Sequence, residues 1–109
     1  MAIQEPTFLI LTALAQGRRH GYALIKDAET LSDGRVTLKV GTLYAALDRL
    51  AKEGLVATAG EEIVDGRLRR FYELTEEGAG TLADEVERMR SLATQAAAHL
   101  RARPGLAFT

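Results

Sequence analysis

The 109-residue sequence contains no cysteine, no tryptophan and only two prolines. Without cysteine the chain can form neither a disulfide nor a thiolate metal site, which suits a reducing compartment. Long hydrophobic runs are also missing, because no stretch approaches the ~20 apolar residues of a membrane span. Residues 1–17 contain a short apolar run but neither a basic leader nor a cleavage pattern. We therefore expect a cytoplasmic protein that is not embedded in a membrane.

An excess of positive charge is absent as well. The sequence has 14 Lys and Arg against 15 Asp and Glu, which gives a formal net charge of -1. Bulk charge therefore gives no support to nucleic-acid binding, which would have to depend on local clusters of cations. At this length, and with 47% hydrophobic residues, the chain is one small domain with a large surface for its volume. Pairing with a second copy would cover part of that surface.

The residues needed for common catalytic and metal sites are not grouped in the sequence. His20 and His99 are far apart and have no cysteine or paired carboxylates beside them. A zinc site therefore lacks ligands, and a nucleophilic triad lacks its motif. Gly78 and Gly80 lack the preceding strand and the lysine of a phosphate-binding loop. We expect no enzymatic activity, no metal and no cofactor.

Residues 39–56 carry most of the functional signal, with the sequence KVGTLYAALDRLAKEGLV. Leu43, Leu47 and Leu50 recur at steps of three and four, which predicts an amphipathic helix with these side chains buried. Gly54 can take the left-handed conformation that ends a helix, with Leu55 folded back over the last turn. Such a helix can meet DNA phosphates, because its outer face combines one aromatic hydroxyl with two cations. The residues of this outer face are Thr42, Tyr44, Ala45, Asp48, Arg49 and Lys52.

Two strand-like segments follow this helix, VATAGEEIV and RLRRFYELT. The dipeptide Asp65-Gly66 between them is the one most suited to a type I′ hairpin turn. Alternation along the second segment places Tyr72 and Leu74 toward the core. A helix that can enter the major groove, followed by an arginine-bearing hairpin, is the plan of a winged helix-turn-helix.

The hairpin carries three arginines that can reach DNA. Arg67 beside the turn and Arg69 one pleat along stand where winged-helix hairpins touch phosphate or the minor groove, and Arg70 can reach the same backbone. Three acidic residues lie on the same hairpin, so a solvated hairpin with self-paired charges is the alternative. The DNA-binding residues expected from the sequence are Lys39, Thr42, Tyr44, Arg49, Lys52, Arg67, Arg69 and Arg70.

Two further helices are predicted before residue 39, at 6–16 and 21–31. The first is apolar nearly all round, so a partner chain or the domain's own core must cover it, and both readings remain open. Arg18, Arg19 and His20 form a basic turn that is either solvated or in contact with DNA backbone. Residues 35–40, RVTLKV, alternate like a short strand that would pair with the hairpin.

The final helix is predicted to start after Thr75 as N-cap and to end near Arg103, before Pro104 and Gly105. Its apolar residues keep heptad a and d spacing beyond what the rest of the domain can cover, which predicts a partner helix. A helix folded back on its own domain is the alternative. The predicted dimer contacts on the first and last helices are Phe8, Leu11, Leu82, Val86, Met89, Leu92, Ala93, Ala96 and Leu100.

Taken together, these segments resemble a known family. GTLYAALDRLAKEGLV followed by RRFYELTEEG is similar to the signature of PadR-type transcriptional regulators, whose recognition helix carries G-T-L-Y and whose wing runs into L-T-x-x-G. With a looser fit at HGYALIKD, the resemblance spans roughly three quarters of the chain. Ala45 stands where many members have proline. The expected fold is mainly α with a small β-hairpin (α+β), with a winged helix-turn-helix at 1–75 and a C-terminal dimerisation helix and tail at 76–109.

The resemblance implies a transcriptional repressor that binds double-stranded DNA as a homodimer. A two-fold protein reads a pseudo-palindromic operator, with one half-site for each recognition helix. The resemblance also implies a small hydrophobic effector, which could sit between the first and last helices near Phe8, Leu11, Met89 and Leu92. A winged-helix module that binds proteins and not DNA is the alternative, because a fold alone does not decide function.

Overall fold

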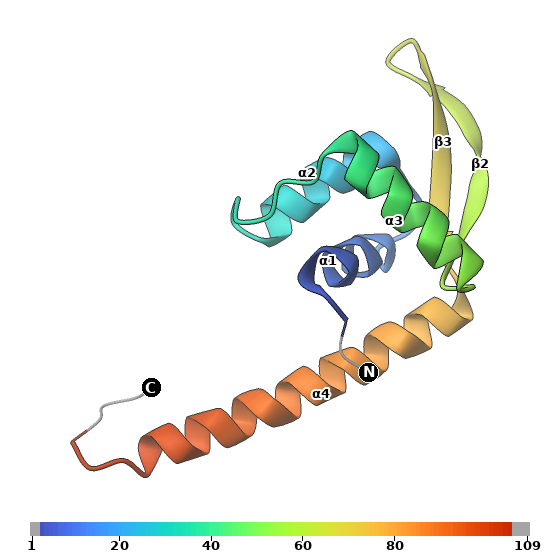
Figure 1. The fold of residues 1–109 in the computed structure, drawn as a ribbon. Helices are drawn as coiled ribbons and strands as arrows, with labels where there is room; N and C mark the ends of the chain where they lie inside the picture. Colours follow the sequence, from blue (N-terminus) through green and yellow to red (C-terminus); the bar gives the residue numbers. More distant parts are fainter. Residues whose placement is uncertain (1–2, 106–109) are drawn as a thin grey trace.

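The structure, a computed structural model, describes residues 3–105. Over this range it has four helices and a small three-stranded antiparallel sheet, which confirms the predicted α+β winged helix-turn-helix (Figure 1). Residues 1–2 and the end of the predicted tail, 106–109, lie outside the described residues. The elements in chain order are α1 (Glu5–Leu14), β1 (Arg19–His20), α2 (Gly21–Leu31), α3 (Val40–Lys52), β2 (Val56–Val64), β3 (Arg67–Leu74) and α4 (Glu76–Arg101).

Helix α1 lies at the centre of the core. Its apolar residues Leu9, Ile10, Leu11, Ala13 and Leu14 are each at most 7% exposed within the single chain. A helix that is apolar all round must be covered all round, and here α2, α4 and β3 contact it. For these five residues the reading as a core helix is therefore the one that the structure supports.

The predicted strand at 35–40 is wrong. Residues 36–39 form a loop before α3, in which Leu38 is buried and Val36 packs against the core. Alternating burial needs no strand here, because a loop lying along the core also turns every second side chain inward. The apolar alternation at these positions therefore reported burial and not strand pairing.

The third strand is instead β1, which falls in the predicted basic turn. Arg19 lies opposite Tyr72 and His20 lies opposite Phe71 in antiparallel register, so that the strand order is β1-β3-β2. Helix α2 begins directly after His20. Strand β1 therefore ties the start of α2 to the wing formed by β2 and β3.

The local signals that end α3 and turn the hairpin are confirmed. Gly54 has φ of +80°, and the amide of Leu55 donates to the carbonyl of Leu50 at 2.9 Å, as in a Schellman motif. In the hairpin turn, φ is +51° at Asp65 and +78° at Gly66. Positive φ at both central residues is the type I′ geometry. These two turns fix the direction in which the wing leaves α3.

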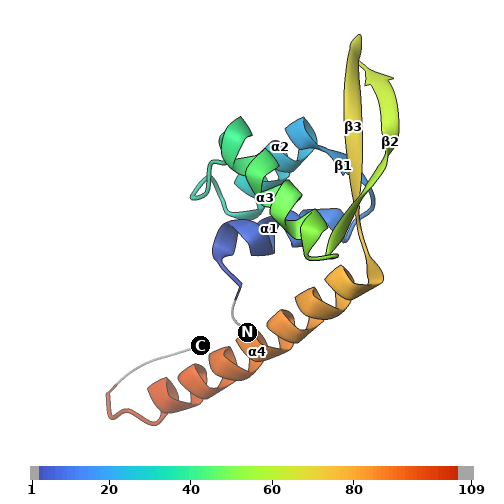
Figure 2. The ribbon, with the colours of Figure 1, turned by 45° about the vertical axis from the view of Figure 1, so that its right-hand side comes forward.

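Helix α4 starts tightly packed and then leaves the rest of the molecule. The Thr75 hydroxyl accepts a hydrogen bond from the amide of Gly78 at 2.9 Å, the predicted N-cap. A Cβ on Gly78 would lie only 2.0 Å from the carbonyl oxygen of Leu55, so only glycine allows this close approach. Figures 1 and 2 show the second half of α4 extending past the other elements, in a molecule of 59 × 27 × 21 Å.

Within residues 3–105, no helix combines the length and the apolar character needed to cross a membrane.

Candidate nucleic-acid interface

The residues predicted on the outer face of α3 do not form one row. Tyr44 and Arg49 are five positions apart, which places them roughly 140° apart around a helix. The guanidinium of Arg49 turns toward α1, where it donates to the Thr7 hydroxyl at 3.0 Å. It also lies 3.5 Å from a carboxylate oxygen of Glu53. Arg49 therefore faces away from Tyr44, and the two do not share a surface.

The second half of α3 offers little uncompensated charge. Lys52 lies 3.2 Å from the carboxylate of Asp48, one helical turn earlier. Both side chains are exposed, so this pair is weak, but it lowers the local positive charge. At the other end of the helix, Lys39 and Thr42 are exposed, and Lys39 has no carboxylate within 4 Å in residues 3–105. The cationic end of α3 is thus its N-terminus.

Tyr44 lies against the first residue of α2. A Cβ on Gly21 would be 2.4 Å from the Tyr44 hydroxyl oxygen and 2.8 Å from the ring carbon that carries it. Only a residue without a side chain leaves the Tyr44 ring in this place. The ring is still 43% exposed, so one edge remains available to a partner.

Beside Tyr44 there is a groove of about 470 Å³ between the starts of α2 and α3 and the wing. It combines aromatic and aliphatic side chains with two arginines of β3. Its lining residues are Gly21, Tyr22, Ile25, Val40, Tyr44, Arg67 and Arg69. The structure therefore brings three of the predicted DNA-binding residues, Tyr44, Arg67 and Arg69, to one place.

The arginines of β3 keep their charge uncompensated. In the part of the chain that the structure describes, no carboxylate lies within 4 Å of Arg67, Arg69 or Arg70. Glu62 is opposite Arg69 in the strand register, but its ion pair is with Arg18. The self-paired hairpin considered from the sequence is not the arrangement seen here.

Two residues near the groove, Tyr22 and Lys26 on α2, were not among the DNA-binding residues predicted from the sequence. The ammonium of Lys26 and the guanidinium carbon of Arg69 each lie 5.4 Å from the centre of the Tyr22 ring. Both distances are within the range of a cation–π contact. The signal that could have found them is the segment HGYALIKD, which contains both residues and contributes to the family resemblance.

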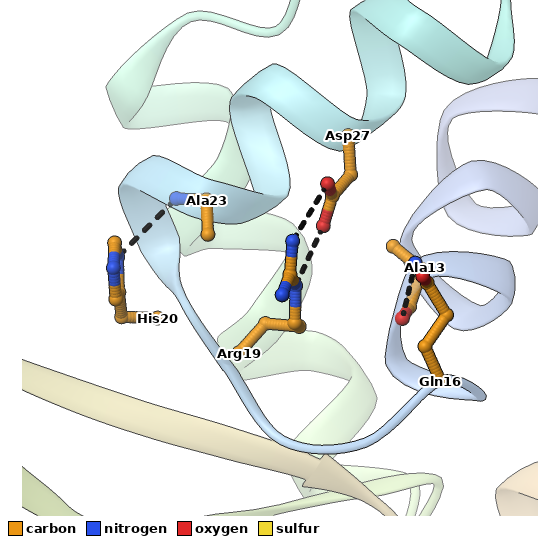
Figure 3. Close-up of polar contacts among 6 residues, drawn as sticks. All are labelled: Ala13, Gln16, Arg19, His20, Ala23 and Asp27. Carbon is orange, nitrogen blue, oxygen red and sulfur yellow. Dashed lines mark hydrogen bonds and ion pairs between the residues drawn. The ribbon is translucent and has the colours of Figure 1, made fainter.

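The two arginines of the predicted basic turn form ion pairs within the chain. Arg19 donates two hydrogen bonds to the carboxylate of Asp27, at 2.8 and 2.9 Å (Figure 3). This hydrogen-bonded pair raises the pKa of Arg19 above its ordinary value. Arg18 pairs with Glu62 and lies over the ring of Phe71, 4.2 Å from its centre. These two cations hold β1 against α2 and the wing.

His20 caps α2. Its Nδ1 accepts a hydrogen bond from the amide of Ala23 at 3.2 Å (Figure 3), which requires that nitrogen to be unprotonated. Burial lowers the pKa of His20 below 6.5, and the positive charges of Arg69 and Arg19 lower it further. The neutral ring that the cap requires is therefore the favoured form.

The predicted dimer surface is only partly available in the single chain. Leu11 is 0% exposed, so its side chain cannot meet a partner in this conformation. Met89 and Leu92 are 43% and 52% exposed, an unusual exposure for large apolar side chains. Among the other predicted contacts, Ala93 and Ala96 are exposed, whereas Phe8, Leu82, Val86 and Leu100 are half-buried. The seam on α4 is thus uncovered from Met89 onward except at Leu100.

A second pocket, of about 730 Å³, lies between the start of α1, the end of α3 and the start of α4. Of the four residues expected near an effector, only Leu11 lines it; Phe8, Met89 and Leu92 do not. Its walls carry several charged and polar groups. The lining residues are Ile3, Gln4, Thr7, Leu11, Arg49, Leu50, Glu53, Leu55, Thr81 and Asp84.

Comparison with known sequences gives a consistent family. The profile of the Transcriptional regulator PadR-like family matches residues 10–84. Transcriptional regulator YqjI of Escherichia coli (strain K12) is 34% identical over 88 residues, which cover 81% of this chain and 41% of YqjI. Transcriptional regulator Rv3488 of Mycobacterium tuberculosis (strain ATCC 25618 / H37Rv) is 34% identical over 86 residues, which cover 79% of this chain and 77% of Rv3488. The chain therefore spans less than half of YqjI but most of Rv3488.

Solved structures share the fold. A PadR family transcription regulator from hypervirulent Clostridium difficile R20291 has a TM-score of 0.70 and 27% identity, covering 84% of this chain and 93% of that chain. Bacillus subtilis PadR in complex with operator DNA has a TM-score of 0.63 and 23% identity, covering 73% of this chain and 45% of that chain. At that identity the second likeness is evidence for the fold alone.

Proposed function

The chain belongs to the PadR-like family of transcriptional regulators, and from this premise we propose that it is a homodimeric repressor that binds a pseudo-palindromic operator. Members of this family are DNA-binding regulators and not enzymes. The observation that carries the proposal is the convergence of Tyr44, Arg67 and Arg69 on one groove, where the arginines lack internal carboxylate partners within residues 3–105. Phosphate oxygens are the partners that such cations favour.

In the proposed complex the N-terminal half of α3 enters the major groove. Lys39 and Thr42 are exposed on this half, and Tyr44 flanks it beside the wing. Arg67 and Arg69 would contact the neighbouring backbone, with Arg70 on the other side of the strand. Arg49 and Lys52 are left out of this interface, because each pairs with a nearby carboxylate, Glu53 at the C-cap of α3 and Asp48 within it. Bacillus subtilis PadR, which has the same fold, has been solved in complex with operator DNA, and this supports DNA as the proposed partner.

We place dimerisation on α4, in the segment 76–109 assigned to it from the sequence. Met89 and Leu92 are exposed and apolar, and Ala93 and Ala96 allow close approach of a second helix. A two-fold axis through this seam would set two α3 helices about one turn of DNA apart, roughly 34 Å or a multiple. Phe8 of α1 is half-buried, and we assign it to the same interface, as expected from the sequence.

An effector would act by changing that spacing. A small hydrophobic molecule bound between α1 and α4 of the dimer, near Phe8, Met89 and Leu92, lowers DNA affinity if it binds the mis-spaced state more tightly. A tenfold effect needs about 1.4 kcal/mol of such preference. Leu92→Trp would fill that site, so a compound that releases DNA from the wild type should lose potency on this variant. Undiminished potency would place the effector elsewhere.

The test of the proposed function is titration of a fluorescent duplex that contains the protein's own promoter, at several salt concentrations. We expect a retarded complex whose affinity falls steeply with salt, because cations that bind phosphates release counterions. Unrelated duplexes of equal length should bind more weakly. Absence of a retarded species at every salt concentration would contradict the proposal and favour a module that binds proteins.

A further inference from the structure

Tyr22 stands at the start of α2, where its ring is 52% exposed. An aromatic ring in this position buries little apolar surface, so packing alone does not account for it. Two cations from different elements lie over it: Lys26 from the next turn of α2 and Arg69 from β3, each 5.4 Å from the ring centre. The ring is thus the physical link between α2 and the cationic side of the wing.

Within residues 3–105, Arg69 has no ion pair or side-chain hydrogen bond that would fix its direction. Its Nε is covered but has no hydrogen-bond acceptor, and no carboxylate lies within 4 Å of the guanidinium in residues 3–105. By contrast, Arg18 and Arg19 are each held by a carboxylate. The face of the Tyr22 ring is therefore the feature that orients the Arg69 guanidinium within the groove.

Both cations lie near one ring, and the described part of the chain supplies no carboxylate within 4 Å of Lys26 or Arg69. Their charges are therefore available to an anion from outside the chain. Lys26 is exposed and Arg69 lines the groove beside Tyr44. The ligand chemistry that fits is a phosphate of the DNA backbone, next to the bases that α3 would read.

We propose that Tyr22 is a positioning residue for DNA binding, which aims Arg69 and Lys26 at the same stretch of phosphate backbone. This inference rests on the proposed function, because it assigns a role within the proposed DNA interface. Its content is specific: the ring acts through the two cations and makes no essential contact of its own with DNA. It also makes α2 a part of the interface, in addition to α3 and the wing.

The experiment is a double-mutant cycle on affinity for the promoter duplex. Tyr22→Leu keeps an apolar side chain but removes the ring, and we expect it to weaken binding roughly three- to tenfold. In the background Lys26→Ala/Arg69→Ala the same change should have no further effect, because the cations that it positions are gone. Tyr22→Phe should keep wild-type affinity, because the ring remains.

Arg67→Ala supplies the matched control background. Arg67 lines the same groove but does not lie over the Tyr22 ring, so Tyr22→Leu should retain its full effect there. Circular dichroism and thermal unfolding check that each variant is folded. An equal loss with and without the two cations, or a loss in Tyr22→Phe as large as in Tyr22→Leu, would overturn the inference. Failure of the wild type itself to bind DNA would instead count against the proposed function.

Discussion

At the scale of single residues, Gly21 illustrates how a missing side chain can serve binding. The Tyr44 hydroxyl occupies the space that a Cβ at position 21 would need. Tyr44 is only half covered, so a larger residue at 21 can push the ring outward. The added Cβ would also lie 3.3 Å from Cδ2 of the buried Leu43, which must shift by a few tenths of an ångström at most. No local sequence pattern indicates this role for Gly21, because Gly21 and Tyr44 are 23 positions apart in the chain and meet only in the folded structure.

We therefore predict that Gly21→Ala weakens DNA binding several-fold while changing the free energy of unfolding by less than about 1 kcal/mol. The displaced Tyr44 ring is the physical cause. Gly80→Ala is the matched control: it lies in α4 with no atom within 4 Å of the added Cβ, so it should stabilise by about 0.5–1 kcal/mol and leave DNA affinity unchanged. Fluorescence anisotropy and urea unfolding measure the two effects. Wild-type affinity in Gly21→Ala would show that Tyr44 needs no such placement.

His20 gives a prediction about pH. Because burial, together with the charges of Arg69 and Arg19, lowers its pKa below 6.5, the unfolded chain binds a proton more readily than the folded one. The negative charges of Asp27 and Asp65 act in the opposite direction. The stabilisation from the neutral cap is therefore fully present above pH 6.5 and is lost as pH falls from there through the folded pKa. Protonation removes the acceptor for the Ala23 amide.

The measurement is urea unfolding at pH 7.5 and pH 5.5. His20→Asn keeps an N-cap acceptor but does not titrate, so its free energy of unfolding should fall less than that of the wild type over this interval. Glu85 adds little to the difference, because hydrogen bonds from Arg88 and from the Ile3 amide lower its pKa to about 2 and it stays ionised at both pH values. Equal losses in wild type and His20→Asn would show that the cap is not the titrating element.

At the scale of elements, the sequence predicted what is encoded locally. Gly54, the Asp65-Gly66 pair and Thr75 each determine a turn or a cap through their own backbone preference, and all three were confirmed. Strand β1 has only two residues and no local signature, since it exists because β3 offers an edge. The alternation of apolar residues in the loop before α3 suggested a strand there, although burial alone produces it.

The direction of a long side chain could not be predicted from the sequence either. Arg49 was assigned to the DNA face from its place on the outer side of α3, but Thr7 from a distant part of the chain accepts its hydrogen bond. Arg67 and Arg69, by contrast, line one groove with Tyr44, because a hairpin that follows a helix directly lies beside it. The sequence thus predicts how neighbouring elements lie, but it does not predict which side chains from distant parts of the chain come into contact.

Helix α4 carries the prediction about assembly. Met89→Glu puts charges into the proposed seam, where two copies would face each other in a low-dielectric contact. We expect a shift from dimer to monomer in sedimentation velocity. Thr94→Glu adds the same charge at an exposed position outside the predicted seam and should leave the dimer intact. A Met89→Glu protein that sediments as a stable dimer would contradict the seam.

At the scale of the whole molecule, a near-neutral chain can bind DNA only if cations without a carboxylate partner gather at one place on its surface. Carboxylates of the same chain lie within ion-pair distance of Arg18, Arg19, Arg49 and Lys52. Uncompensated cations, among them Arg67 and Arg69, remain around the groove between α2, α3 and the wing. A net charge of -1 is therefore compatible with a local cluster of cations at this groove, through which the protein would reach DNA.

The most direct test is the salt dependence of operator binding for four proteins: wild type, Arg67→Ala, Arg69→Ala and Arg49→Ala. Each lost phosphate contact should lower the slope of log K against log salt by roughly one unit. We predict this loss for the variants at 67 and 69, and the wild-type slope for the variant at 49, whose guanidinium is held by Thr7 and Glu53. A reduced slope in Arg49→Ala, with wild-type slopes in the other two, would show that phosphate is bound at the Arg49 side of α3 and not by the wing.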